Sequence, residues 1–195
     1  MTAEHVDLHD QPVQAVEMHA AETHSVQAHT VQIGESFIGD GVNAAHVNTV
    51  LGHRAGPAGT AWATALATPS AGHVPFVTVL RPSLPVKPLT LFVTKSAPAN
   101  EQHGNLIWGA AQAGIAAGVA DALANGTVTA EQADSHVVIA AVWVNPGADS
   151  EDAVYRNNRE SARTALENGA QQLPSTAAVI EARNSPSNPF FTPRG

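Results

Sequence analysis

A chain of 195 residues is long enough for one compact domain with a modest appendage, and it can bury a core without disulfide or metal support. It contains no cysteine, which excludes a disulfide framework, thiolate chemistry and cysteine-based zinc sites. Nine Lys and Arg residues stand against 17 Asp and Glu residues, and no basic stripe could follow phosphate groups, so we expect no nucleic-acid binding. No run of about 18 apolar residues occurs, so we expect no membrane span.

Residues 1–30 differ in composition from the rest of the chain, because they combine acids with histidines and few large apolar groups. A metal-binding tract is one interpretation, although only His5 and His9 have the spacing that brings two imidazoles together on a helix. The alternative is a flexible, solvated arm or an extra edge strand in an oligomer. This N-terminus lacks the basic start and apolar run of a secretory signal, so we expect a cytoplasmic protein.

The domain itself is expected over residues 31–195. A short strand is predicted over residues 31–38, running into a Gly-Asp-Gly loop. Alternation over residues 46–51 predicts a second strand, which places His46 and Asn48 on one face. A helix is then predicted to open at Pro57, because proline is favoured in a first helical turn.

The middle of the chain predicts two strands and a long helix. Residues 74–80 and 89–94 are rich in apolar and β-branched side chains, which is typical of strands, and a proline-rich connection joins them. Apolar residues recur at helical spacing over residues 105–124. Three glycines in this helix each cost up to about 1 kcal/mol relative to alanine, so we expect close backbone approach there. They are Gly109, Gly114 and Gly118.

The last third predicts a short capped helix, a buried strand and a long helix. Residues 129–132 fit a capping box, and residues 137–144 form a continuous apolar strand. A helix is expected over residues 151–168, and residues 177–182 are expected to add a strand. Strands and helices mix without strict alternation, so we predict an α+β fold in which helices cover a mixed sheet.

A search for common catalytic constellations finds neither a G-x-S-x-G elbow, an H-E-x-x-H pair nor a P-loop. The residues alone leave His46, beside a Gly-rich turn, as a candidate general acid or base. The competing interpretation is a histidine that is satisfied by hydrogen bonds within the sheet. On residue chemistry alone, the second interpretation is favoured.

The order of short motifs resembles one family. Gly34-Glu-Ser-Phe-Ile-Gly-Asp-Gly41, followed by Asn43-Ala-Ala-His-Val47, is similar to the opening of formaldehyde-activating enzymes, typically G-E-A-L-V-G-D-G and then A-H-[IV]-D. Further blocks follow in the same order as in that family. They are Gly56-Pro-Ala-Gly-Thr-Ala61, Val79-Leu-Arg-Pro82, Lys87-Pro-Leu-Thr-Leu91, Trp108-Gly-Ala-Ala-Gln112, Ala120-Asp-Ala122 and Asn188-Pro-Phe190.

The resemblance implies a two-layer, ribosomal-protein-S5-domain-2-like sandwich and a hydro-lyase of one-carbon metabolism and methylotrophy. That family condenses formaldehyde with tetrahydromethanopterin, giving 5,10-methylenetetrahydromethanopterin and water. The resemblance further implies tetrahydromethanopterin as co-substrate, no required metal, and a homopentamer with the carrier bound between subunits. His46 matches the proposed proton donor, and general acids of this kind contribute about 10²–10⁴-fold.

Other contact positions carry over unequally. Lys95 and Gln112 match pterin-contacting residues of the family, whereas Asn48, Val77 and Ala97 stand where the family has Asp, Leu and Thr. Asn48 removes a negative charge that could stabilise an imidazolium or an iminium cation. These departures indicate a divergent paralogue. The alternatives are a non-catalytic or weakly catalytic protein that binds a reduced pterin or senses formaldehyde, and an assembly role in which the N-terminal arm recruits a partner.

The remaining conspicuous side chains match no family contact. His73 and His103 are expected on the surface or in loops. The large aromatic residues are expected in the core or at a subunit interface. They are Trp62, Trp108 and Trp143.

Overall fold

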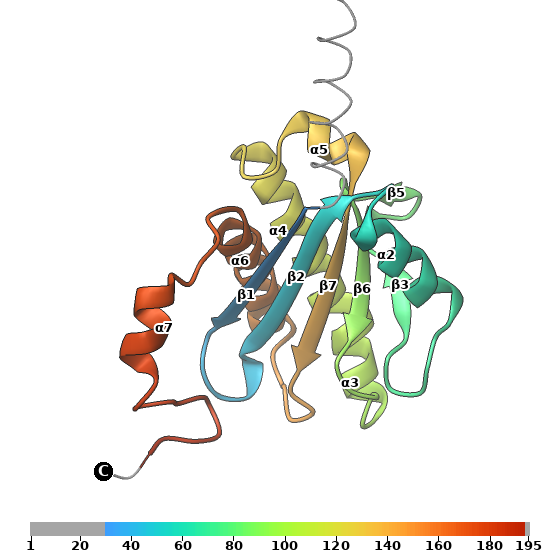
Figure 1. Ribbon diagram of the computed structural model, residues 1–195. Coiled ribbons are helices and arrows are strands. Elements are labelled where there is room, and N and C mark those ends of the chain that lie inside the picture. Colours follow the sequence, from blue (N-terminus) through green and yellow to red (C-terminus); the bar gives the residue numbers. More distant parts are fainter. Residues whose placement is uncertain (1–29, 194–195) are drawn as a thin grey trace, which may run out of the picture.

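The computed structural model describes residues 30–193, so the acidic, histidine-rich arm predicted over residues 1–30 lies outside the described residues except for Thr30 (Figure 1). A five-stranded sheet has the order β1-β2-β7-β6-β3. Strands β6 and β7 are parallel, and the other neighbouring pairs are antiparallel. The strands are β1 (Val31–Ile38), β2 (Ala45–His53), β3 (Pro75–Val77), β6 (Leu89–Thr94) and β7 (His136–Val144).

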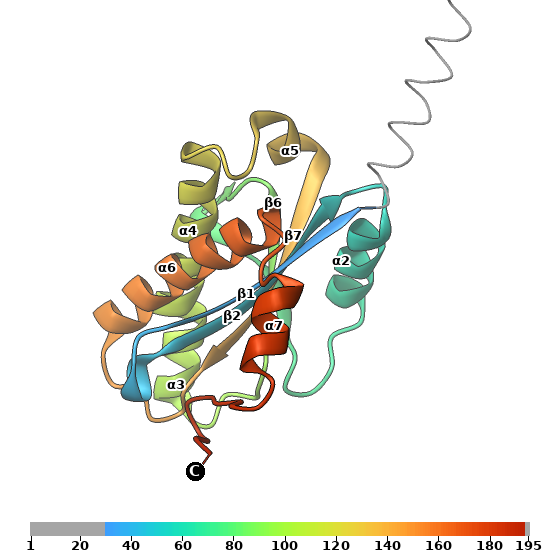
Figure 2. The same ribbon diagram turned by 60° about the vertical axis from the view of Figure 1, so that its left-hand side comes forward.

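Helices cover the two faces of this sheet unequally. The long helices α4 (Gln112–Ala124) and α6 (Glu151–Ala170) pack side by side on one face, and α2 (Pro57–Ala67) lies on the other (Figure 2). Gly52 shows how closely α2 approaches, because a Cβ added there would lie 2.7 Å from the Cβ of Ala58. The predicted α+β fold with a mixed sheet covered by helices is confirmed.

The main core fills the space between the sheet and the helices α4 and α6. It is built from side chains that are fully buried, and each of the larger ones contributes roughly 1.5–3 kcal/mol by leaving water. Its members alternate along the strands and recur at helical spacing, as the apolar pattern predicted. They include Val47, Phe92, Ile115, Val138 and Leu166.

Two of the three helix glycines permit the close approach that was predicted. A Cβ at Gly114 would lie 2.5 Å from the carbonyl oxygen of Tyr155, and one at Gly118 would lie 2.3 Å from that of Arg159. Both oxygens belong to α6, so α4 and α6 can pack at this distance only without side chains at these positions. Gly109 differs, because a Cβ there would meet nothing within 4 Å.

The long helix begins earlier than predicted and is not uniform. The side chain of Asn100 accepts a hydrogen bond from the backbone N–H of His103, which caps α3 (Glu101–Leu106), and a π-helical segment η2 (Ile107–Ala111) joins α3 to α4. The whole stretch Glu101–Ala124 is long and apolar enough, by composition, to cross a membrane. In this fold its buried face belongs to the core that α4 shares with α6 and the sheet, which accounts for its apolar character.

The predicted capping box is confirmed, and local groups also cap two further helix ends. The side chain of Thr129 accepts from the N–H of Gln132, whose own side chain accepts from the N–H of Thr129, so both bonds of the capping box begin α5 (Ala130–Ser135). Gly126 has a positive φ of 83° directly after α4, where glycine is favoured. Ser150 caps α6 by accepting from the N–H of Ala153.

The single strand predicted over residues 74–80 is instead two short strands in different sheets. The chain leaves β3 at Thr78, whose N–H and hydroxyl both donate to the carbonyl of Thr90. It then forms β4 (Val79–Arg81), which pairs with β5 (Leu84–Pro85) in a separate two-stranded sheet. The predicted proline-rich connection therefore contains a hairpin.

Residues 177–182 are helical, so the strand predicted there is wrong. They belong to α7 (Thr176–Ala182), which begins where the side chain of Ser175 accepts from the N–H of Ala178. Every residue of α7 is exposed, and Figure 1 shows the helix standing off the sheet edge. A run of three to four apolar residues fits either a helix or a strand, and here the N-cap decides.

The surface position predicted for His103 is also wrong, because its side chain is almost completely buried. The ring Nδ1 accepts from the N–H of Ala99, and Nε2 lies 3.0 Å from the carbonyl oxygen of Val144. Both ring nitrogens are thus hydrogen-bonded. This histidine ties the start of the core helix to the end of β7.

Candidate active site

The ends of four strands bring polar and aromatic side chains together on the sheet face that α2 leaves uncovered. His46 is the second residue of β2 and pairs in register with Phe37 of β1 and Trp143 of β7. Lys95 follows β6 directly, and its backbone N–H donates to the carbonyl of Val142 at 2.9 Å. Alternation along the strands points these side chains away from the face that α4 and α6 cover.

Three charged or titratable groups form a line across this face. The Nε2 of His46 lies 3.0 Å from the Oε1 of Glu35, and its Nδ1 lies 3.3 Å from the Nζ of Lys95. The ammonium of Lys95 also approaches the backbone oxygen of His46 at 3.4 Å. An ammonium can only donate, so Nδ1 accepts from it and Nε2 carries the proton that is donated to the carboxylate.

Burial lowers the pKa of both His46 and Lys95. The pKa of His46 is lowered mainly by burial and then by the charge of Lys95, while Glu35 acts in the opposite direction. Burial also lowers the pKa of Lys95 to about 8, against a smaller raising effect from Glu35. Protonating both groups would place two positive charges 3.3 Å apart. The pair therefore favours states in which a single proton is held between them.

A cavity of about 510 Å³ opens over this line of groups. That volume suits a small organic ligand. Its floor is the strand face, and its outer wall is the C-terminal segment over residues 187–190. The ring of Phe190 stands edge-on to that of Trp143, with 5.8 Å between the ring centroids. Hence the C-terminal segment covers the end of the sheet face that α2 does not reach.

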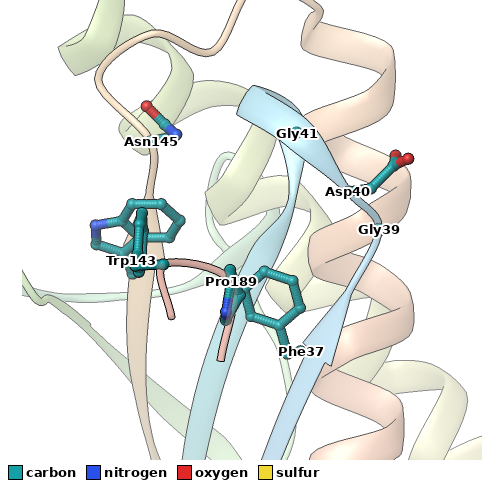
Figure 3. A pocket seen from close by; sticks show the side chains of 8 residues that line it. Phe37, Gly39, Asp40, Gly41, Trp143, Asn145 and Pro189 are labelled. Carbon is teal, nitrogen blue, oxygen red and sulfur yellow. The ribbon is translucent and has the colours of Figure 1, made fainter. Parts of the chain in front are cut away.

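A second cavity of about 490 Å³ adjoins the first and shares its aromatic wall. Figure 3 shows Phe37 and Trp143 with Pro189 between them in the view, while Asp40 points away from the rings. The Gly39–Gly41 turn and Asn145 complete the lining. The two cavities together offer a flat, largely apolar space that ends at the charged line.

Residues 33–191 match the family described as formaldehyde-activating enzyme (Fae). The chain belongs to the formaldehyde-activating enzyme family. Over 157 residues it is 35% identical to the 5,6,7,8-tetrahydromethanopterin hydro-lyase of Methanosarcina barkeri, a match that covers 80% of this chain and 88% of that protein.

Longer relatives carry a second part. The chain is 38% identical over 157 residues to the bifunctional enzyme Fae/Hps of Archaeoglobus fulgidus, and 37% identical over 151 residues to that of Methanococcoides burtonii. These matches cover 80% and 77% of this chain. The chain spans about 40% of the length of these bifunctional relatives.

The structure brings together only some of the family positions that were predicted for the site. His46 and Lys95 are in contact, and Asn48 lies on the same face of β2, paired in register with Glu35. Ala97 is exposed two residues beyond Lys95. Neither Asn48 nor Ala97 is among the residues that line the cavity over His46.

Val77 and Gln112 lie away from His46 within one chain. Val77 is on β3, opposite Leu91 at the far side of the sheet. The side-chain oxygen of Gln112 accepts a hydrogen bond of 2.6 Å from the backbone N–H of Val79, so within this chain it holds β4 against the helical layer. Neither residue is among those that line the cavity over His46.

Sequence reasoning missed Glu35 and the aromatic walls of the site. Glu35 stands in the quoted Gly-Glu motif, but no role was assigned to it. Its position on the same face as Phe37 is predictable from the sequence, because side chains alternate with a period of two along β1. Trp143 was expected in the core or at a subunit interface, and it is a half-buried wall of both cavities.

Proposed function

We propose that this protein condenses formaldehyde with tetrahydromethanopterin to 5,10-methylenetetrahydromethanopterin and water. It would act as a carbon–oxygen lyase of the hydro-lyase type, in cytoplasmic one-carbon metabolism and methylotrophy. The observation that carries the proposal is the line of Glu35, His46 and Lys95 beneath a cavity of ligand size. Membership of the formaldehyde-activating enzyme family supports the choice of substrates.

The reaction needs a proton donor in one step and a proton acceptor in a later step. Attack of a pterin amine on formaldehyde gives a carbinolamine, whose hydroxyl leaves readily only as water. We assign His46 as the general acid that supplies this proton. When the second pterin amine closes the ring on the resulting iminium, it loses a proton, which the neutral imidazole takes back. Glu35 is placed to stabilise the imidazolium through Nε2 at 3.0 Å.

Glu35 also bears on the choice between an enzyme and a binding protein. Asn48 stands where the family has a carboxylate, which favours a weakly catalytic paralogue that binds a reduced pterin or senses formaldehyde. However, the histidine in this chain keeps a carboxylate partner in Glu35, one strand away. The loss of charge at Asn48 therefore leaves the proton donor supported, and we favour the enzyme.

We further propose a homopentamer in which the carrier binds between subunits. Two observations support this arrangement. Within one chain Gln112 and Val77 lie away from His46, so a second copy could bring those positions to the site. Several large apolar side chains are also exposed on the described part of the chain. They include Ile33, Val179, Ile180, Phe190 and Phe191.

The test is the rate of methylenetetrahydromethanopterin formation over the spontaneous background. The purified full-length protein is compared with His46→Ala and with His53→Ala, a matched control at the other end of the same strand. Acceleration that is lost only in His46→Ala supports the proposal. A background rate in the wild type, with the pterin still bound, would favour the binding paralogue. Asn48→Asp would then be expected to increase the rate.

A further inference from the structure

The chain contains only two lysines, Lys87 and Lys95, and their surroundings differ sharply. The side chain of Lys87 is 59% exposed, and its Nζ forms an ion pair with the carboxylate of Asp134. Lys95 is half-buried in the cavity and forms no ion pair with any carboxylate of residues 30–193. Among the described residues, its Nζ forms hydrogen bonds only with the Nδ1 and the backbone oxygen of His46.

This setting makes Lys95 a better nucleophile than an ordinary lysine. Because burial lowers its pKa to about 8, about one-tenth of its amine is neutral at pH 7. For an unperturbed lysine, whose pKa is about 10.4, the neutral fraction is below about one-thousandth. A proton acceptor, the Nδ1 of His46, lies 3.3 Å away. A partly neutral amine beside an acid–base group is the arrangement by which lysines add to carbonyl carbons.

We propose that Lys95 is a covalent carrier of the one-carbon unit, which captures formaldehyde as an iminium ion and passes it to the pterin. This inference rests on the proposed function for the acceptor, but the capture step itself needs only formaldehyde. It assigns Lys95 a catalytic role in place of the pterin contact that the family resemblance suggested, and it replaces direct attack of the pterin amine on formaldehyde by attack of Lys95. Lys87, with its carboxylate partner in solvent, has no part in it.

Capture of formaldehyde passes through a hydroxymethylamine on Lys95. The neutral amine of Lys95 attacks the carbonyl carbon, a C–N bond forms, and the carbonyl electron pair moves to oxygen. A proton passes from nitrogen to that oxygen, giving a hydroxymethylamine. The imidazolium of His46 then protonates the hydroxyl group, the C–O bond breaks, and water leaves. The product is a protonated methylene iminium on the nitrogen of Lys95, and His46 is left neutral.

The transfer step returns every group to its starting state. A pterin amine attacks the methylene carbon, and its proton moves to the lysine nitrogen. The bond between that nitrogen and the methylene carbon breaks, which frees the neutral amine of Lys95 and leaves an iminium on the pterin. The second pterin amine closes the ring and gives its proton to His46. The sum is formaldehyde plus the diamine, giving the methylene adduct and water.

The cavity favours this iminium over its hydrated form. Trp143 and Phe190 line the same cavity as Lys95, so the end of its side chain lies beside apolar surface. The carboxylate of Glu35, on the far side of His46, provides negative charge against the cation.

The test traps the iminium without any pterin. The full-length protein is mixed at pH 7 with an equivalent of ¹³C-formaldehyde and cyanoborohydride, and the initial rate of methylation at each lysine is read by peptide mass spectrometry. Burial in the cavity increases the neutral fraction of the Lys95 amine, and restricted access offsets part of this gain, so we expect Lys95 to react at least about tenfold faster than Lys87. His46→Gln should slow trapping at Lys95 and leave Lys87 unchanged.

Two results would overturn the inference. One is trapping at Lys95 that is no faster than at Lys87 in the wild-type protein. The other is full pterin turnover by Lys95→Arg, which keeps the charge but cannot form the iminium, with Lys87→Arg as the matched control. Selective trapping without any pterin turnover would instead support capture by Lys95 and refute the proposed function. The two failures are thus distinguishable.

Discussion

The contact between Glu35 and His46 predicts the effect of removing one carboxylate. Glu35→Gln keeps the shape of the side chain but removes the charge that raises the pKa of His46. The two side chains are 60% and 36% exposed, so the 3.0 Å interaction is screened and is worth about 1 kcal/mol at most. That free energy corresponds to about a fivefold change in the ratio of imidazole to imidazolium, so the pKa of His46 is lowered further.

A lower pKa means less imidazolium at any pH above it. The population of protonated His46 should fall about fivefold there, and its greater acidity offsets part of the loss, so we expect turnover to drop about two- to fivefold. The pKa is measured from the ring protons of His46 by NMR titration, beside the pH profile of turnover. Glu160→Gln, on the exposed side of α6, is the matched control. An unchanged or raised pKa of His46 in Glu35→Gln would refute the reasoning.

Three further predictions concern other parts of the structure. His46→Ala should lower turnover by about 10²–10⁴-fold with an unchanged circular dichroism spectrum. Lys95→Met removes a positive charge beside the ring, so the His46 pKa should rise and the imidazolium should persist to higher pH. An NMR titration that gives a lower pKa for His46 in this variant would contradict the prediction. Gly118→Ala should lower the free energy of unfolding by about 1–3 kcal/mol, because its Cβ would lie 2.3 Å from a carbonyl oxygen of α6. Gly109→Ala, where nothing lies within 4 Å, is its control in the same urea titration.

Many elements were predictable because their signals are local. The capping box at Thr129 and the glycine at position 126 satisfy backbone groups within a few residues, so their meaning does not depend on the rest of the fold. Strand β6 coincides with the predicted residues 89–94. His46 and Lys95 were identified through short motifs in a family order, which again needs no tertiary contact.

Other features were not predictable because they depend on partners far along the chain. Thr78 turns the chain out of the sheet by bonding to Thr90, and the burial of His103 depends on the carbonyl of Val144. The apolar run within residues 177–182 is compatible with either a strand or a helix. Because it has no neighbouring strand to pair with, the N-cap at Ser175 makes it helical.

The sequence by itself determined the alternation of apolar residues, the caps, the glycine positions and the choice of His46 as the candidate acid–base residue. Only the tertiary structure decided that Glu35 and Lys95 meet that histidine on opposite sides. The physical reason is register. Glu35 reaches His46 because the register of β1 and β2 pairs Phe37 with His46 and Glu35 with Asn48. Lys95 reaches His46 from the other side, because β7 lies between β2 and β6 and the parallel register of β6 and β7 brings Lys95 to the end of β7. A shift of one residue in either pairing would turn these side chains to the opposite face of the sheet.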